Sequence, residues 1–408
     1  MDPIRPIIKP YAWGSREALA RLRGRSVPSA GPEAELWMGA HPAGPAGLTR
    51  DGRATTLHEV VAAAPERELG GACARRFGGR LPFLLKVLAA EQPLSVQVHP
   101  DREQARTAFA AQLATATATA TATGTGPGTY ADDWPKPELL YALTRFEVLA
   151  GFRDRDEAVA VFDGLGLADV RPLTDVLRAG DGATALTDAL RTVLETGHDR
   201  AGLVPAVVAA SRRQARAPGP YAAAYDAVVR MAEHHPGDPG LVASLLMRYQ
   251  VLEPGTALFM PAGGLHAYLN GVGVELMAAS DNVLRAGLTT KEVNIPELLR
   301  VTDPAVRVPV VRPSGVPGSR TRAYACPVEE FALYRTELGG PPKPVVPSSG
   351  PRIVLCVDGS ALLRGPEGDE LSLGPGASCF LSDSDRDVTA QGDGTLFVAG
   401  TGLGVAHR

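Results

Sequence analysis

The sequence predicts a mainly β protein in which two jelly-roll barrels are separated by a helical insertion. Short apolar runs broken by glycine and proline fill residues 1–153 and 249–320, a pattern typical of strands and tight turns. Apolar residues at helical spacing replace it over residues 154–248. The strand pattern returns over residues 321–408. We therefore expect an N-terminal barrel from 1–153 completed by 249–320, a helical insertion at 154–248, and a C-terminal barrel at 321–408.

The N-terminal elements follow in order along the chain. Strands are predicted at residues 34–39 and 81–88, with a short helix over 57–64 and a second over 66–76 that Gly70 and Gly71 interrupt. A helix is expected over 103–114. An alternating Ala/Thr tract at 114–123 follows, and we interpret it as a surface loop of unassigned purpose. Residues 134–143 are predicted to be an extended segment that leads into a strand.

The remaining elements divide into helices and then strands. Helical spacing at residues 159–162, 186–194 and 221–231 predicts a helical block, which ends at the turn 236–240 or one short helix later. Strands are predicted at 249–252, 257–260 and 265–269. The C-terminal part repeats this style at 352–357, 360–364 and 378–381, and no convincing ligand set occurs there, so a structural role is predicted for it.

Composition excludes several classes of function. The formal net charge of −4 and the lack of a Lys/Arg-rich run argue against nucleic acid as a partner. The N-terminus has no basic segment followed by an apolar core, and no apolar run is long enough to cross a bilayer, so we expect a cytoplasmic protein without a membrane partner. The four cysteines are scattered without a C-x-x-C spacing, so any metal should sit on nitrogen and oxygen ligands.

Four residues form a candidate metal-ligand set. Gln97 and His99 stand two residues apart in an extended run, so they share one face of a strand. His266 follows the tight turn 261–264, and Glu138 lies at the start of an apolar strand. Each residue alone is more often an ordinary polar side chain. Together they offer an amide oxygen, two imidazoles and a carboxylate, a complete set for a zinc ion that can still take water or substrate.

Three further charged residues lie in segments rich in small and apolar types, namely Lys136, Glu275 and Arg285. A charge in such surroundings costs free energy unless it is paired or used. For Glu275, a structural ion pair with a basic residue and a catalytic role are equally open.

Several long motifs, in the same order, make the chain resemble the type I mannose-6-phosphate isomerases, which are zinc enzymes of the cupin superfamily. The similarity spans at least residues 7–300. The motifs are YAWGS at 11–15, AELWMGAHP at 34–42, PFLLKVL at 82–88, QPLSVQVHP at 92–100, KPE at 136–138, HAY at 266–268 and SDNVLRAGLT at 280–289.

The resemblance implies two cupin barrels, one zinc ion per chain, a sugar-phosphate substrate and a monomeric enzyme. It implies that Gln97, His99, Glu138 and His266 hold the zinc. It also implies that Arg285 serves catalysis, and that the residues lining the same pocket are Ser95, Lys86, Lys136, Tyr268 and Glu275.

One departure from the family pattern affects the mechanism. Family members commonly carry Asn-His before the KPE motif, whereas this chain has Trp134 and Pro135 there. A mechanism that uses that histidine as the base cannot operate here.

The predicted reaction interconverts D-mannose 6-phosphate and D-fructose 6-phosphate through an enediol. Zinc and Arg285 would stabilise the developing negative charge. Glu275 and Lys136 are the candidate bases. Ser95 and Lys86 would bind the phosphate, with Arg285 as a further candidate, and Tyr268 would also contact substrate. The product would serve mannose catabolism or GDP-mannose biosynthesis. Two alternatives remain open: an isomerase of a related sugar phosphate, and a non-catalytic cupin that binds a sugar phosphate.

Overall fold

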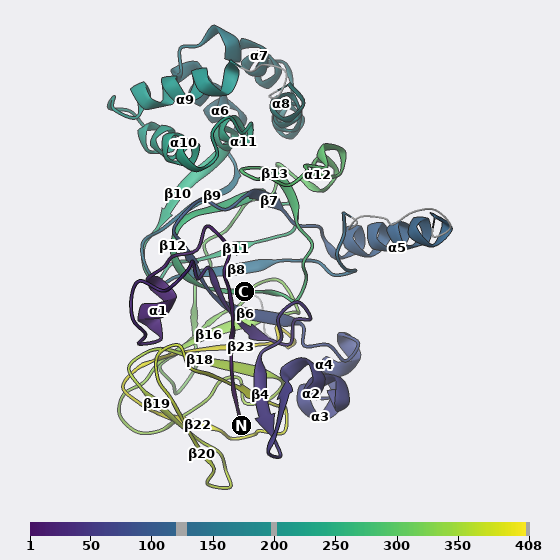
Figure 1. The fold of residues 1–408 in the computed structure, drawn as a ribbon, viewed down its shortest axis with the longest axis vertical. Coiled ribbons are helices and arrows are strands. Elements are labelled where there is room, and N and C mark those ends of the chain that lie inside the picture. Colours follow the sequence, from purple (N-terminus) through teal and green to yellow (C-terminus); the bar gives the residue numbers. More distant parts are fainter. Residues whose placement is uncertain (120–128, 197–201, 405–408) are drawn as a thin grey trace.

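A ten-stranded sheet forms the middle of the molecule, and the predicted site residues lie in its strands or within two residues of a strand end (Figure 1). The computed structural model describes residues 1–119, 129–196 and 202–404. The strand order is β10-β9-β12-β6-β3-β2, with β7, β8, β11 and β13 attached beside this path. The strands are β2 (Ile7–Lys9), β3 (Glu35–Gly39), β6 (Phe83–Ala90), β7 (Val96–Val98), β8 (Glu138–Ala142), β9 (Phe146–Phe152), β10 (Met247–Leu252), β11 (Ala257–Met260), β12 (His266–Ala278) and β13 (Leu284–Gly287).

Several short elements lie outside the ten-stranded sheet. The capping box of Thr56 with Glu59 starts α2, because each side chain bonds the other's backbone N–H. Gly70, at a φ of 78°, ends α3 and begins α4. This is the interruption that the sequence predicted. The elements are the hairpin β4 (Gly47–Arg50) and β5 (Arg53–Thr56), and the helices α1 (Ala18–Leu22), α2 (Leu57–Ala63), α3 (Pro65–Leu69), α4 (Gly71–Arg76) and α12 (Ile295–Val301).

The predicted loop in the Ala/Thr tract is wrong for its first part. Helix α5 (Arg102–Thr119) projects from the sheet and continues through residues 114–119 (Figure 1). Alanine is the best helix former, and the Thr115 hydroxyl donates to the carbonyl of Ala111 at 3.0 Å, as threonine does inside helices. Residues 120–123 of the tract lie outside the described residues.

The predicted helical block stands at one end of the molecule (Figure 1). Its apolar faces pack together with residues of the central sheet, including Val98 and Leu284. The short helix α11 ends the block just after the predicted turn, as the sequence suggested. The helices are α6 (Arg155–Gly164), α7 (Arg171–Ala179), α8 (Gly182–Thr196), α9 (Leu203–Gln214), α10 (Ala222–His234) and α11 (Gly240–Ala243), with 3-10 turns at Ala168–Val170 and Ser244–Leu246.

Two packed sheets form the opposite end, and their apolar residues share one core. The seven-stranded sheet contains β1 (Asp2–Ile4), β14 (Ser314–Gly315), β15 (Thr321–Tyr324), β16 (Ala332–Glu337), β18 (Arg352–Asp358), β21 (Ser378–Leu381) and β23 (Thr395–Gly400). The four-stranded sheet contains β17 (Lys343–Pro344), β19 (Ala361–Arg364), β20 (Glu370–Leu373) and β22 (Thr389–Gly392). The predicted fold class, mainly β with helical insertions, is confirmed.

One strand has a place that the sequence did not predict. The N-terminal strand β1 pairs antiparallel with β21, with Asp2 opposite Phe380, so the start of the chain belongs to the C-terminal sheet. A search of the described helices finds no segment with both the length and the apolar character needed to cross a membrane.

Candidate metal centre and its surroundings

Strand β12 brings the four candidate ligands together from distant parts of the chain. His266 begins β12 and lies opposite Gln97 of β7. Glu138 begins β8, which pairs with β12 further along. His99 follows β7 directly, and its side chain shares the face of Gln97 as the period of two requires.

The three ionisable members of this set are buried and close. The ligand atoms of His99, Glu138 and His266 all lie within 4.8 Å of one another, a grouping that could hold a metal ion. The Glu138 carboxylate is 3.2 Å from His99 Nε2 and 3.4 Å from His266 Nε2. The Gln97 side-chain nitrogen lies 3.4 Å from His266 Nε2. The Gln97 amide therefore lies beside the other three candidate ligands.

Hydrogen bonds to the backbone orient both imidazoles. Nδ1 of His99 donates to the carbonyl of Asn282 at 2.8 Å, and Nδ1 of His266 donates to the carbonyl of Gly264 at 2.9 Å. In the tautomer that makes these bonds the proton is on Nδ1, and Nε2 of each ring faces the carboxylate. Although it is buried, Nε2 of His99 makes no hydrogen bond with a described residue. A buried, unpartnered nitrogen lone pair is what a metal ligand presents, so these residues fit a metal ion.

The charges in the site favour the ligand forms of these groups. Burial lowers the pKa of His99 to about 4, with a contribution from the positive charge of Lys136. Burial opposes ionisation of Glu138, but Lys136 and the histidines outweigh it and hold its pKa well below the usual range. Near neutral pH the site therefore contains a neutral His99 and a carboxylate.

A bulge in β12 puts Glu275 near the ligands. The register of β12 against β9 shifts between Tyr268 and Asn270, where β12 has one extra residue. Because of this extra residue, the odd-numbered side chains after the bulge, including Glu275, share the face of His266 and Tyr268. Gly271, with a φ of 136°, follows the bulge, and a Cβ there would lie 2.6 Å from the ring of Phe146.

Glu275 is one of three charges on neighbouring strands. It lies opposite Lys86 of β6, and the Lys86 ammonium is 3.0 Å from Glu275 and 3.8 Å from Glu35 of β3. Burial raises the pKa of Glu275, although Lys86 opposes this. For Lys86 the two carboxylates outweigh burial and raise its pKa. Lys86 also lies 5.2 Å from the centre of the Trp37 ring.

Lys136 and Tyr268 both contact Glu138. The Lys136 ammonium is 3.3 Å from one carboxylate oxygen, and the Tyr268 hydroxyl donates to the other at 3.4 Å. Tyr268 is fully buried, and burial together with Glu138 raises its pKa well above the usual value. Its hydroxyl therefore stays protonated and points at a candidate ligand.

Arg285 and Ser95 have no such partners. Arg285 lies opposite Gln97 across β7 and β13, half-buried, and no ion pair or hydrogen bond joins its guanidinium to a described residue. Burial lowers its pKa. The half-buried hydroxyl of Ser95 likewise makes no hydrogen bond within the described part of the chain.

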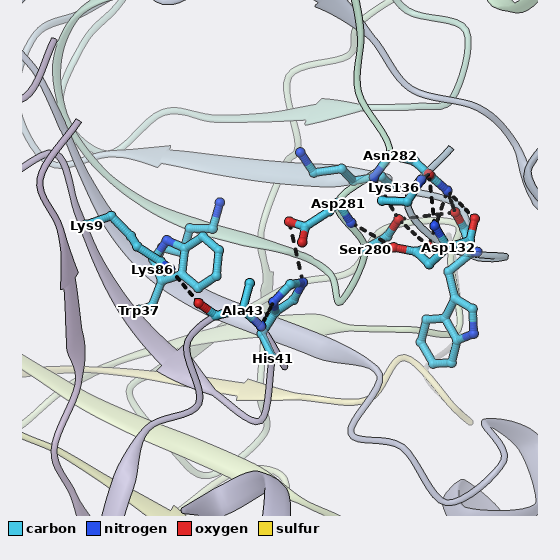
Figure 2. A network of polar contacts seen from close by, with 12 residues as sticks. Lys9, Trp37, His41, Ala43, Lys86, Asp132, Lys136, Ser280, Asp281 and Asn282 are labelled. Atoms are coloured by element: carbon cyan, nitrogen blue, oxygen red, sulfur yellow. Dashed lines mark hydrogen bonds and ion pairs between the residues drawn. The ribbon is translucent and has the colours of Figure 1, made fainter. Parts of the chain in front are cut away.

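Four polar residues around the site were not singled out in the sequence analysis: Glu35, His41, Asp132 and Asn282. Figure 2 draws the last three together with Lys136 and Lys86. His41 Nε2 lies 3.6 Å from Asp281, while its Nδ1 accepts the N–H of Ala43 at 3.2 Å. A signal for Glu35 was available, because an acid inside the apolar run 34–39 poses the same question as Glu275.

The Trp134-Pro135 departure has a clear structural outcome. The Trp134 ring is buried, packs against Phe77 at 5.9 Å between ring centres, and carries the Arg80 guanidinium 4.1 Å from its centre. Its side chain therefore belongs to the core. Pro135 has no titratable group.

Comparisons with known proteins agree with this architecture. Residues 1–155 match the model of the phosphomannose isomerase type I catalytic domain, and residues 320–400 match that of the mannose-6-phosphate isomerase cupin domain. Mannose-6-phosphate isomerase of Escherichia coli is 35% identical over 393 residues, covering 95% of this chain and 96% of that protein. The human mannose-6-phosphate isomerase is 31% identical over 427 residues, covering 97% and 92%.

Solved structures give the same result. A crystal structure of a point variant of phosphomannose isomerase from Salmonella typhimurium superimposes with a TM-score of 0.88 at 33% identity, covering 99% of this chain and all of that chain. The likeness extends over nearly the whole chain in both sequence and fold. The chain therefore belongs to the family of type I mannose-6-phosphate isomerases.

Proposed function

We propose that this mannose-6-phosphate isomerase works with one zinc ion held by Gln97, His99, Glu138 and His266. The observation that carries the proposal is the buried Nε2 of His99, which has no described hydrogen-bond partner and faces the Glu138 carboxylate. Two imidazole nitrogens and a carboxylate oxygen are typical ligands of zinc. Gln97 would add its amide oxygen, and a zinc ion bound there would act as a Lewis acid on substrate oxygens.

The proton transfer requires a base of this chain. The base removes the proton from C2 of mannose 6-phosphate to form an enediol and returns it to C1, while the C2 hydroxyl proton passes to the C1 oxygen. Two groups can serve. Glu275 has a pKa raised by burial, and Lys136 lies 3.3 Å from the ligand Glu138. No histidine stands beside Lys136 to share this task.

The anionic parts of the substrate need cationic and hydroxyl donors. Arg285 and Ser95 suit this role, because no described side chain occupies either group. The charge of Lys86 is already balanced by Glu275 and Glu35, so we assign it to holding Glu275 in place rather than to the phosphate. Tyr268 orients Glu138 through its hydrogen bond, which leaves it a minor part in contacting substrate.

Metal content and turnover test the proposal together. The purified protein should hold about one zinc per chain by elemental analysis, and chelation should abolish the conversion of mannose 6-phosphate to fructose 6-phosphate until zinc is restored. Full activity in a protein freed of metal would reject the zinc site. Bound zinc without turnover of this substrate would favour a related sugar phosphate or a binding role. The predicted monomer, cytoplasmic location and pathway remain predictions of the sequence.

A further inference from the structure

Asp132 joins the two loops that border the candidate site (Figure 2). Its Oδ1 accepts from the Ser280 hydroxyl at 2.8 Å, from the Trp134 N–H at 2.9 Å and from the Asn282 amide at 3.2 Å. Its Oδ2 accepts the N–H of Asp281 at 2.9 Å. One carboxylate thus fastens the segment before β8 to the segment after β12.

Asn282 doubles this connection. Its side-chain amide donates to the carbonyls of Asp132 at 2.9 Å and Trp134 at 2.8 Å, and its side-chain oxygen accepts the N–H of Ala131 at 2.8 Å. Both Asn282 and Ser280 are fully buried, so these bonds are shielded from water.

Each end of this connection carries a group of the site. The backbone carbonyl of Asn282 orients His99 through Nδ1 at 2.8 Å. Lys136 follows Trp134 by two residues and contacts Glu138 at 3.3 Å. Asp281, whose N–H bonds to Asp132, has its carboxylate 3.6 Å from Nε2 of His41.

We propose that Asp132 is a positioning residue that holds a metal ligand and Lys136 in register with each other. It acts on His99 through Asn282 and on Lys136 through the backbone of Trp134. The part that concerns His99 rests on the proposed zinc site. Partners of this kind, which orient a ligating histidine from outside, typically change metal affinity by about 10- to 100-fold when removed.

The departure at residues 134–135 makes this connection more important in this chain. Trp134 fixes the segment from one side by packing its ring against Phe77 and Arg80. Asp132 fixes it from the other side by accepting the Trp134 N–H. With proline at position 135, no side chain next to Lys136 can bond to substrate and hold the segment.

The substitution Asp132→Asn tests the proposal with little change in shape. An amide has one acceptor oxygen, and its NH₂ group would face either the Asp281 N–H or the donors around Oδ1. Asp133→Asn is the matched control, because Asp133 is a half-exposed neighbour that makes a 3.3 Å ion pair with the exposed Arg80. We expect zinc affinity in Asp132→Asn to fall about 10- to 100-fold in a chelator competition.

Turnover gives a second readout that a purely structural role would not move. At saturating zinc and well below the unfolding temperature, kcat of Asp132→Asn should fall about tenfold with less change in KM, because Lys136 is displaced. Asp133→Asn should stay within about twofold of the unchanged protein on both measures. Ser280→Ala, which removes one of the bonds to Asp132, should give a smaller loss of the same kind and serves if Asp132→Asn does not fold.

The outcomes separate this inference from the proposed function. Unchanged zinc affinity and kcat in Asp132→Asn, or a lower melting temperature alone, would overturn the positioning role while the zinc enzyme stands. If the unchanged protein holds no zinc, the zinc site is lost, and the kcat of Asp132→Asn still decides whether Asp132 positions Lys136.

Discussion

The central sheet and the C-terminal sheets bury charged groups in opposite ways. In the central sheet, Lys86, Glu138 and Glu275 have their closest polar partners in other side chains, and Nε2 of His99 makes no hydrogen bond with a described residue. In the C-terminal sheets, the fully buried Arg352 donates to the backbone carbonyls of residues 347, 350, 382 and 385.

The kind of hydrogen-bond partner distinguishes a candidate functional site from a structural one. A buried guanidinium whose four hydrogen bonds all go to main-chain oxygens holds loops in place. A group of side chains that face one another around a free lone pair can change partners when a metal or a substrate enters. Burial of charge alone therefore does not identify function, whereas the kind of partner does.

Removing a metal ligand of the central site should have the largest effect. We expect Glu138→Gln to lose most of its zinc and at least about a thousandfold in kcat/KM, several kcal/mol of transition-state stabilisation. Elemental analysis and a coupled assay measure this. Glu147→Gln is the control, because Glu147 pairs with Arg145 and Arg230 away from the site. Zinc retained at full occupancy by Glu138→Gln would show that the ligand set is wrong.

Removing the Arg352 side chain should lower the stability of the protein and leave its activity nearly unchanged. Arg352→Leu leaves buried carbonyls without a donor, so we expect the free energy of unfolding to fall by about 3 kcal/mol or more in urea denaturation. The kcat/KM of the folded enzyme should stay within about twofold, because the substitution lies outside the central sheet. A large loss of activity at unchanged stability would contradict the structural assignment.

Low pH should reduce the folding stability of the metal-free protein, because His99 in the central site becomes protonated. Burial lowers the pKa of His99 from 6.5 to about 4, so below pH 6.5 the unfolded chain binds a proton that the folded chain does not. Stability from this group is complete above about pH 6.5 and is lost as pH falls toward 4, at most about 3 kcal/mol.

Urea denaturation of the chelated protein at several pH values measures this effect. His99→Gln should have a shallower fall in stability over the same range, because the titrating group is gone. Equal slopes for both proteins would assign the acid sensitivity to other groups.

Removing a candidate base should reduce turnover and leave the metal in place. Glu275→Gln and Lys136→Met are made separately, and the one that lowers kcat by about a hundredfold at unchanged zinc content identifies the base. Lys86→Met shows what disturbing the ion pair of Glu275 does by itself. If neither substitution reaches this size, another group transfers the proton.

Local sequence was sufficient for part of the elements and for choosing the ligand candidates, but it did not single out β9, β13, β16, β23 or α12. The period of two puts Gln97 and His99 on one face, and turn residues mark the strand ends, because both depend on neighbours in the chain. The Ala/Thr tract shows the limit of this reasoning. Low complexity suggested a loop at 114–119, but the high helix propensity of alanine extends α5 through it.

The fold class, the alternation of strand-rich and helical regions, and the residue types able to bind a metal follow from the sequence. Which of these residues meet depends on the tertiary structure. The bulge in β12 brings Glu275 to Lys86, β1 joins the far sheet, and Asp132 meets Asn282 across two loops. Such contacts join residues far apart in the chain, and they depend on how strands pair and shift register, which the pattern of a single segment does not contain.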